Sequence, residues 1–219
     1  MKACQEHQAR LVFFDNVYSL GKVTGPMTED SPYNPCSKKG EIRARIASRL
    51  LDETSKGNIK SIIARSADFY GPNCRNSVFN ELVIKNLVKG KSAQVLITAE
   101  KLHSYTYTED CGKALWTLVQ QEDAWNQTWH MPTASPALNH RQLVDLASGN
   151  LGRAGKITLM SRFMCRALSL FVPVLREVIE MLYQNDSDYI FDASKIEKRF
   201  GLVATSYETG IKNTVNSYK

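Results

Sequence analysis

Short apolar runs alternate with amphipathic stretches along most of the chain. Two of these runs, residues 10–15 and 59–64, end in polar side chains and are typical of buried strands. The stretch between them, residues 36–53, predicts a helix because an apolar side chain recurs every fourth residue, at Ile42, Ile46 and Leu50. We expect these three side chains to face the sheet. The order strand, helix, strand predicts a right-handed crossover between two parallel strands.

The same patterns predict further elements in the rest of the chain. Helices are expected at residues 1–8, 77–89, 108–119, 139–149, 194–200 and beyond 205. Strands are expected at residues 95–97, 127–131, 156–159 and 189–192, and residues 103–107 are expected to be extended. This alternation of strands and helices predicts an α/β fold.

Polar residues at the predicted helix starts can cap free backbone N–H groups. Thr108 or Asp110 is expected to cap the helix that follows them. Capping boxes are predicted from the spacing of two pairs, Asn139 with Gln142 and Thr205 with Glu208.

The most apolar run of the chain, residues 163–183, is too charged to cross a membrane. A span needs about 20 nearly uncharged residues, whereas this run contains arginine and glutamate side chains. We expect a packed pair of helices that breaks at Pro173, and no membrane partner.

Composition narrows the class of protein. The chain has 219 residues, 43% of them apolar and 23% charged, as in ordinary globular proteins. Its five cysteines are scattered, with no C-x-x-C pair, which argues against a disulfide framework or a zinc site and favours a reducing, cytoplasmic compartment. The first eight residues lack the apolar core of a signal peptide. His103 and His130 are interpreted as structural, so no metal is expected.

The net charge of +6 is concentrated in part on one predicted helix. Its basic residues are Lys38, Lys39, Arg43, Arg45 and Arg49. Such a helix could bind nucleic acid, but no nucleic-acid motif or interleaved aromatic residue accompanies it. A solvated helix face and contact with a phosphate-bearing cofactor are the two interpretations we retain.

Three segments, in order, resemble the NAD-dependent epimerase/dehydratase family, the extended or atypical short-chain dehydrogenase/reductases. They are D-N-V-Y at residues 15–18 followed by Gly21, S-P-Y-N-P-C-S-K-K at residues 31–39, and A-R-S-A-D-F-Y-G-P at residues 64–72. The pattern D-x-S-K-x-x-x-x-F-G at residues 192–201 is similar to the family's C-terminal part.

The resemblance implies a partial Rossmann-like parallel sheet with helices on both faces in residues 1–132, with a substrate-side segment at about 73–110. Residues 133–219 would form a small α+β substrate-binding part. A full-length member would use NAD or NADP, bound by a glycine-rich turn that this chain lacks. We therefore expect a truncated member that alone binds NAD(P) weakly or not at all. Its open sheet edge would favour a homodimer or self-association.

The family's reaction uses a tyrosine and a lysine four residues later, whose charge lowers the tyrosine pKa. Lys39 is the equivalent lysine by helical phase, with Lys38 as the alternative, but Pro35 lies four residues before Lys39. Tyr33 could act as the proton donor from the loop, with help from either lysine. Cys36, beside two lysines near the helix start, is a second candidate; a buried structural cysteine is the other interpretation.

Further site residues follow from the resemblance. Asn16 stands where the family usually has a Ser or Thr that orients the substrate oxygen, so it is a catalytic candidate. The implied substrate contacts are Arg65, Asp68, Tyr70 and Tyr105. The implied cofactor contacts are Asn16, Lys39, Arg65 and Ser66. Arg65 and Asp68 have an alternative interpretation, in which they do not contact substrate. They would instead form a structural pair that fixes the turn before Gly71.

Two functions are therefore predicted. The first is an NAD(P)-dependent epimerase, dehydratase or reductase that acts on a small polar substrate such as a nucleotide sugar. The second is a non-catalytic atypical member that binds a dinucleotide or a partner as a sensor or scaffold. The missing tyrosine favours the second function, and the substrate-side motifs favour the first.

Overall fold

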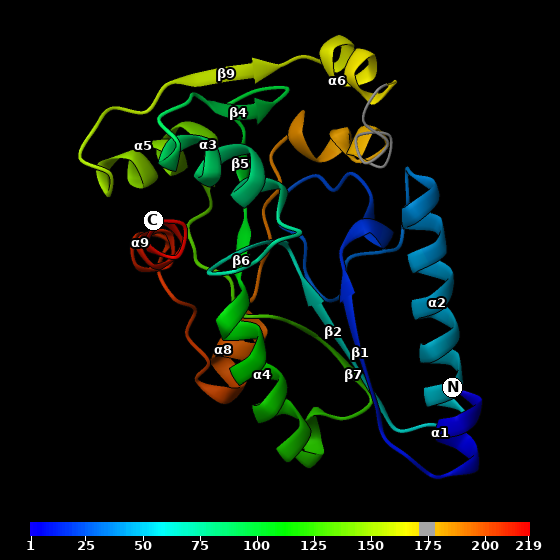
Figure 1. Cartoon of the computed structure of the whole chain (residues 1–219). Coiled ribbons are helices and arrows are strands. Elements are labelled where there is room, and N and C mark those ends of the chain that lie inside the picture. Colours follow the sequence, from blue (N-terminus) through cyan, green and yellow to red (C-terminus); the bar gives the residue numbers. More distant parts are fainter. Residues whose placement is uncertain (171–177) are drawn as a thin grey trace.

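A computed structural model describes residues 1–170 and 178–219 and is built around a parallel sheet (Figure 1). The sheet contains β1 (Leu11–Asn16), β2 (Ser61–Ser66) and β7 (Gln127–His130), in the order β1–β2–β7. Both pairings are parallel, and the register places Asp15 beside Arg65 and Arg65 beside His130. The predicted parallel crossover between the first two strands is confirmed.

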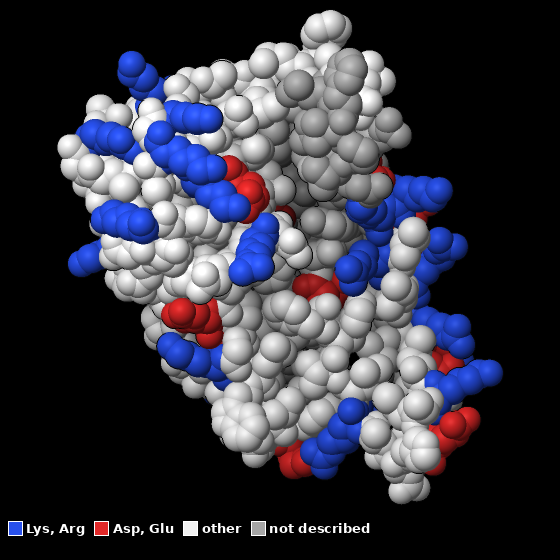
Figure 2. Space-filling view, viewed as in Figure 1, with Lys and Arg blue, Asp and Glu red and all other residues white. Residues whose placement is uncertain are grey.

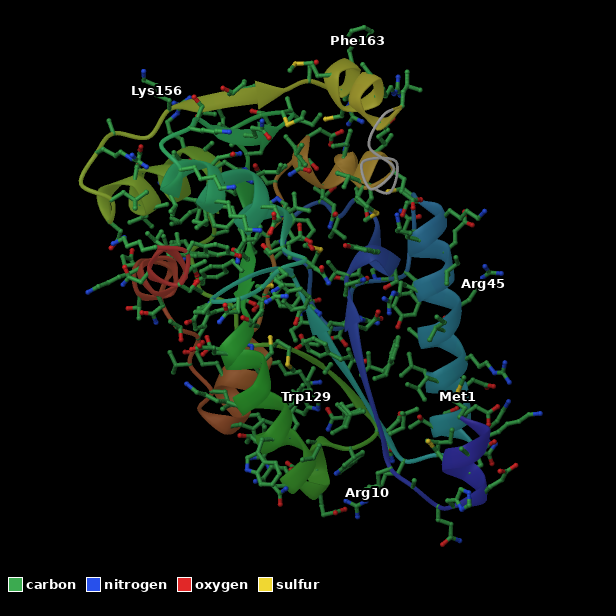
Figure 3. The ribbon with its side chains drawn as sticks, viewed as in Figure 1. Met1, Arg10, Arg45, Trp129, Lys156 and Phe163 are labelled. Carbon is green, nitrogen blue, oxygen red and sulfur yellow. The ribbon has the colours of Figure 1, made fainter. Side chains whose placement is uncertain are left out.

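Helices cover both faces of this sheet. On one face, α2 (Lys38–Ser55) packs Ala47 and Leu50 against Ile63 of the central strand. On the other face lie α4 (Thr108–Gln120) and α8 (Ser194–Phe200) (Figure 1). Trp129 of β7 lies on this second face, where its ring packs against Phe200 at 5.0 Å between centroids (Figure 3). The two-faced α/β arrangement agrees with the prediction.

The expected inward face of α2 is wrong at Ile42 and Ile46 and confirmed at Leu50. Ile42 and Ile46 are 40% and 38% exposed, and the buried side of the helix consists of Gly40, Ala47, Leu50 and Thr54. Close approach sets this rotation, because a Cβ at Gly40 would lie 2.4 Å from the carbonyl oxygen of Tyr18. The helix therefore turns its small residues, Gly40 and Ala47, toward the interior of the fold. Arg45 points outward, on the same exposed side as the two isoleucines (Figure 3).

The strand β1 is less buried than its apolar sequence predicts. In the described part of the chain it pairs only with β2, and Phe14 is 39% exposed. Asp15 is instead the buried side chain of this strand, at 3% exposure. An edge strand is covered on one side only, whereas β2, paired on both sides, is buried along its whole length.

Three smaller strand pairs extend the fold beyond the central sheet. β3 (Asp68–Tyr70) pairs in parallel with β6 (Tyr105–Tyr107), and β4 (Ala93–Leu96) pairs in parallel with β9 (Ile157–Met160). β5 (Leu102–His103) pairs antiparallel with β8 (Leu138–Asn139). The strand predicted at residues 189–192 forms only isolated bridges, from His103 to Tyr189 and from Met27 to Phe191.

The helix predicted at residues 77–89 is interrupted. A π-helical turn, Asn80–Ile84, precedes the short α3 (Lys85–Val88). Asn80 is fully buried, and its side-chain amide donates to the carbonyl oxygens of Gly71 at 2.8 Å and Cys74 at 3.3 Å. The π-helical turn thus begins at a buried, hydrogen-bonded asparagine, and such turns often occur at functional sites.

Two helix caps differ from the predictions and one is confirmed. The capping box at Asn139 forms and opens α5 (His140–Gly149). Asp110 lies inside α4 and accepts hydrogen bonds from the backbone N–H of Thr205 at 2.7 Å and from its hydroxyl at 2.9 Å. With Thr205 held there, Ser206 caps α9 (Tyr207–Asn216) instead.

Two further α-helices in the described part of the chain are short, α1 (Lys2–Glu6) and α6 (Arg162–Ser169). The break expected at Pro173 lies outside the described residues. Among the residues that the structure describes, none of the helices combines the length and apolar character that a membrane span requires.

We expect Asp110→Ala to lower the free energy of unfolding by about 2 kcal/mol, because the partly buried N–H and hydroxyl of Thr205 lose a charged acceptor. Urea denaturation measures the change. Asp123→Ala is the matched control, since its ion pair with Arg199 is exposed and is worth less than about 1 kcal/mol. Equal losses in the two variants would contradict this role for Asp110.

Candidate functional site

A cavity of about 370 Å³ is lined by residues that lie outside the strands of the central sheet. Its walls come from β3, β6, β4, the π-helical turn and residues 178–185. The volume is within the range of small-molecule sites in proteins. Most of the lining is apolar, and the charged side chains among its described residues are Lys39 and Asp68.

Asp68 enters the cavity from the first residue of β3. Its Oδ2 lies 2.9 Å from Nε2 of His103, and the carboxylate is one-third exposed while the imidazole is 2% exposed. The ring of His103 stacks on Tyr189, with centroids 4.4 Å apart and planes 18° from parallel. The histidine therefore holds the carboxylate in a fixed orientation at the cavity wall.

Tyr105 and His140 form a second pair in the cavity wall. The phenol oxygen of Tyr105 lies 2.8 Å from Nε2 of His140. Burial, and to a smaller extent the nearby His103, lowers the pKa of His140 to about 3. Burial also raises the pKa of Tyr105 well above its ordinary value. Both side chains are therefore neutral at physiological pH, and the pair can exchange hydrogen bonds with a polar ligand.

Lys39 lies at the start of α2 and forms an ion pair with Glu180. Its Nζ is 2.8 Å from Oε1 of that residue, and the second carboxylate oxygen accepts the Lys39 backbone N–H at 3.4 Å. The lysine lowers the pKa of Glu180 by these hydrogen bonds. A carboxylate at a helix N-terminus is also stabilised by the helix dipole, so Lys39 and Glu180 join α2 to the C-terminal part.

The candidate proton donors lie outside this cavity. The Tyr33 hydroxyl accepts a hydrogen bond from Arg65, whose guanidinium carbon is 5.0 Å from the tyrosine ring centroid. Neither Tyr33 nor Cys36 is among the described lining residues. Cys36 is exposed, so its interpretation as a buried structural cysteine is wrong. Lys38 is exposed too. The catalytic roles of these residues stay predictions.

The residues predicted to contact a cofactor are mostly engaged inside the fold. Arg65 is 1% exposed and Ser66 is fully buried. Asn16 accepts the Tyr18 backbone N–H at 3.0 Å through its side-chain oxygen. Only Lys39 of the four lines the cavity. These side chains do not by themselves fit a dinucleotide, so their cofactor contacts stay a prediction.

The predicted substrate contacts separate in the structure. Asp68 and Tyr105 both line the cavity, because the parallel register of β3 and β6 places them side by side. Tyr70 is 1% exposed and belongs to the apolar core. The alternative Arg65–Asp68 ion pair is wrong, since Arg65 hydrogen-bonds to Tyr33 and Asp68 to His103.

Sequence reasoning missed most of the polar side chains of the cavity, Tyr18, His140 and Gln184 among them. Tyr18 follows directly from the D-N-V-Y motif at a strand end, a position at which ligand contacts are common. His140 and Gln184 come from distant parts of the chain, and no sequence pattern marks them.

The basic helix forms an exposed edge of the molecule. Figure 2 shows Lys and Arg side chains along α2, of which Lys38, Arg45 and Arg49 are exposed. Arg43 lies 3.4 Å from the buried Asp15. The solvated-face interpretation therefore fits three of the five basic residues.

Comparison with known proteins finds dTDP-glucose 4,6-dehydratases and an uncharacterized protein among the relatives of this chain. A dTDP-glucose 4,6-dehydratase from Escherichia coli is 24% identical over 205 residues, which cover 87% of this chain and 51% of that protein. The chain thus spans about half the length of this relative. An uncharacterized 37.6 kDa protein from Escherichia coli O111:H- is 21% identical, with 100% of this chain and 66% of that protein covered.

Solved structures share the fold. A UDP-glucuronic acid 4-epimerase from Bacillus cereus in complex with NAD superposes with a TM-score of 0.79 at 14% identity, covering 100% of this chain and 65% of that one. A dTDP-glucose 4,6-dehydratase from Streptomyces venezuelae with NAD and TYD bound gives 0.75 at 20% identity, covering 99% and 62%. The model of the NAD dependent epimerase/dehydratase family matches residues 1–130, and the chain belongs to this family.

Proposed function

We propose that this chain provides the substrate-binding part of an NAD(P)-dependent epimerase, dehydratase or reductase that acts on a small polar molecule such as a nucleotide sugar. The ligand occupies the cavity lined by Asp68 and Tyr105. The observation that carries the proposal is this cavity, in which two oriented polar pairs interrupt an apolar lining. Few fixed polar groups in an apolar pocket are typical of small-molecule sites.

The names of the relatives support the class of ligand. The curated relatives include dTDP-glucose dehydratases, and the similar structures include epimerases and dehydratases with NAD bound. In this proposal NAD(P) supplies hydride exchange when bound, and residues of this chain hold and orient the substrate.

A non-catalytic binding protein is the second candidate. Pro35 lies where a tyrosine would precede Lys39 by one helical turn, and the lysine is paired with Glu180. Without a tyrosine there, the usual proton exchange has no donor at that position. Product formation from dTDP-glucose and NAD by a protein that contains this chain would contradict the second candidate.

Calorimetric titration of the 219-residue chain with dTDP-glucose and UDP-glucose tests the proposed cavity. We expect saturable binding of at least one sugar nucleotide, and its loss in Leu82→Trp, because Leu82 lines the cavity and a larger ring fills it. Val203→Trp, at a position that is 72% exposed, is the matched control and keeps the affinity. No binding, or equal binding in the two variants, would contradict the proposal.

The neutral state of His140 predicts a pH dependence of stability. Its folded pKa of about 3 is below the ordinary 6.5. Between these values the unfolded chain binds more protons, so stability falls as pH is lowered, by up to about 1.4 kcal/mol per pH unit. We expect His140→Gln to flatten the curve between pH 6.5 and 4.5 in urea denaturation. His7→Gln, at an exposed position, keeps the original slope; parallel curves for the two variants would contradict a neutral His140.

A further inference from the structure

The charges in the cavity favour a particular kind of ligand. Lys39, the cation among the described lining residues, already pairs with Glu180 at 2.8 Å. Asp68 has one partner in the described chain, the imidazole of His103. A negatively charged ligand group beside Asp68 would be repelled by its carboxylate, because like charges at short range repel. The charge of Lys39, which is paired with Glu180, would not offset this repulsion.

The orientation of Asp68 leaves an acceptor for a ligand. His103 binds Oδ2 at 2.9 Å, and its buried ring is fixed by the stack on Tyr189. The other carboxylate oxygen, Oδ1, makes no hydrogen bond to the described residues. An ionised carboxylate is an acceptor only, so the group that binds it must donate.

Two tyrosines belong to the wall of the same cavity. Tyr18 and Tyr105 line the cavity with Asp68. The parallel register of β3 and β6 places Tyr105 directly beside Asp68. Aromatic faces attract cations, most strongly where water is excluded. A carboxylate among tyrosine rings therefore suits an ammonium group.

We propose that the cavity recognises an amino-bearing sugar, whose ammonium group pairs with Oδ1 of Asp68 between the rings of Tyr18 and Tyr105. This inference rests on the proposed function, since it assigns the class of ligand for the same cavity. Asp68 binds the ammonium group, and His103 is a positioning residue that fixes the orientation of the Asp68 carboxylate. The phosphate-bearing end of a nucleotide sugar lies away from Asp68.

The test compares two sugar nucleotides that differ in one group, UDP-glucosamine and UDP-glucose, by calorimetry on the 219-residue chain. We expect UDP-glucosamine to bind at least about tenfold more tightly, because a charge-assisted hydrogen bond is added. Asp68→Asn should abolish this advantage. Asp123→Asn, at an exposed ion pair, is the matched control and keeps it.

A second measurement keeps the test valid if Asp68→Asn unfolds. In the unsubstituted chain, the sugar protons next to the amine should give nuclear Overhauser contacts to ring protons of Tyr18 and Tyr105. Equal affinity for the two ligands, with both lost in Leu82→Trp, would overturn the amine inference and leave the proposed function intact. An advantage that persists in folded Asp68→Asn would also overturn it. Absence of binding by both ligands would overturn the inference and the proposed function together.

Discussion

The cavity depends on the direct passage of β2 into β3 at Ala67. This residue is 2% exposed, and its backbone N–H donates to the Thr106 hydroxyl at 3.1 Å. Thr106 in turn lies 2.7 Å from the Thr133 hydroxyl. The central strand is thereby joined rigidly to the pair β3–β6, whose register sets Asp68 beside Tyr105. The positions of Asp68 and Tyr105 therefore follow from this register and from the link of β3 to β2, which is buried along its whole length.

Much of the fold could be predicted because local patterns and packing agree. The parallel pairing of residues 11–16 with 61–66 follows from two apolar runs and the helix between them. The capping box at Asn139 needed only its spacing. The face of α2 could not be predicted from its isoleucines. The close contact between Gly40 and the turn at Tyr18 decides it, and that contact depends on tertiary structure.

The site was predicted less completely than the fold. Asp68 and Tyr105 could be named because the family resemblance implies substrate contacts at these positions, and both line the cavity. Their partners could not, since His103 and His140 lie 35 residues away from them along the chain. Tyr33 was named from the sequence as a proton donor because it lies near the two lysines. In the structure its hydroxyl instead accepts a hydrogen bond from the buried Arg65 at the end of the sheet. Hydrogen bonds to distant segments can thus keep apart side chains that are close in the sequence and were expected to act together.

The central claim is that the cavity beside Asp68 is the ligand site. Amide chemical shifts of the ¹⁵N-labelled chain during titration with UDP-glucosamine test it most directly. The account predicts the largest changes at Asp68, Leu82 and Tyr105, with little change around Ala193 and Leu202, which line a separate hollow. Changes confined to that second hollow, or spread evenly over the surface, would contradict the account.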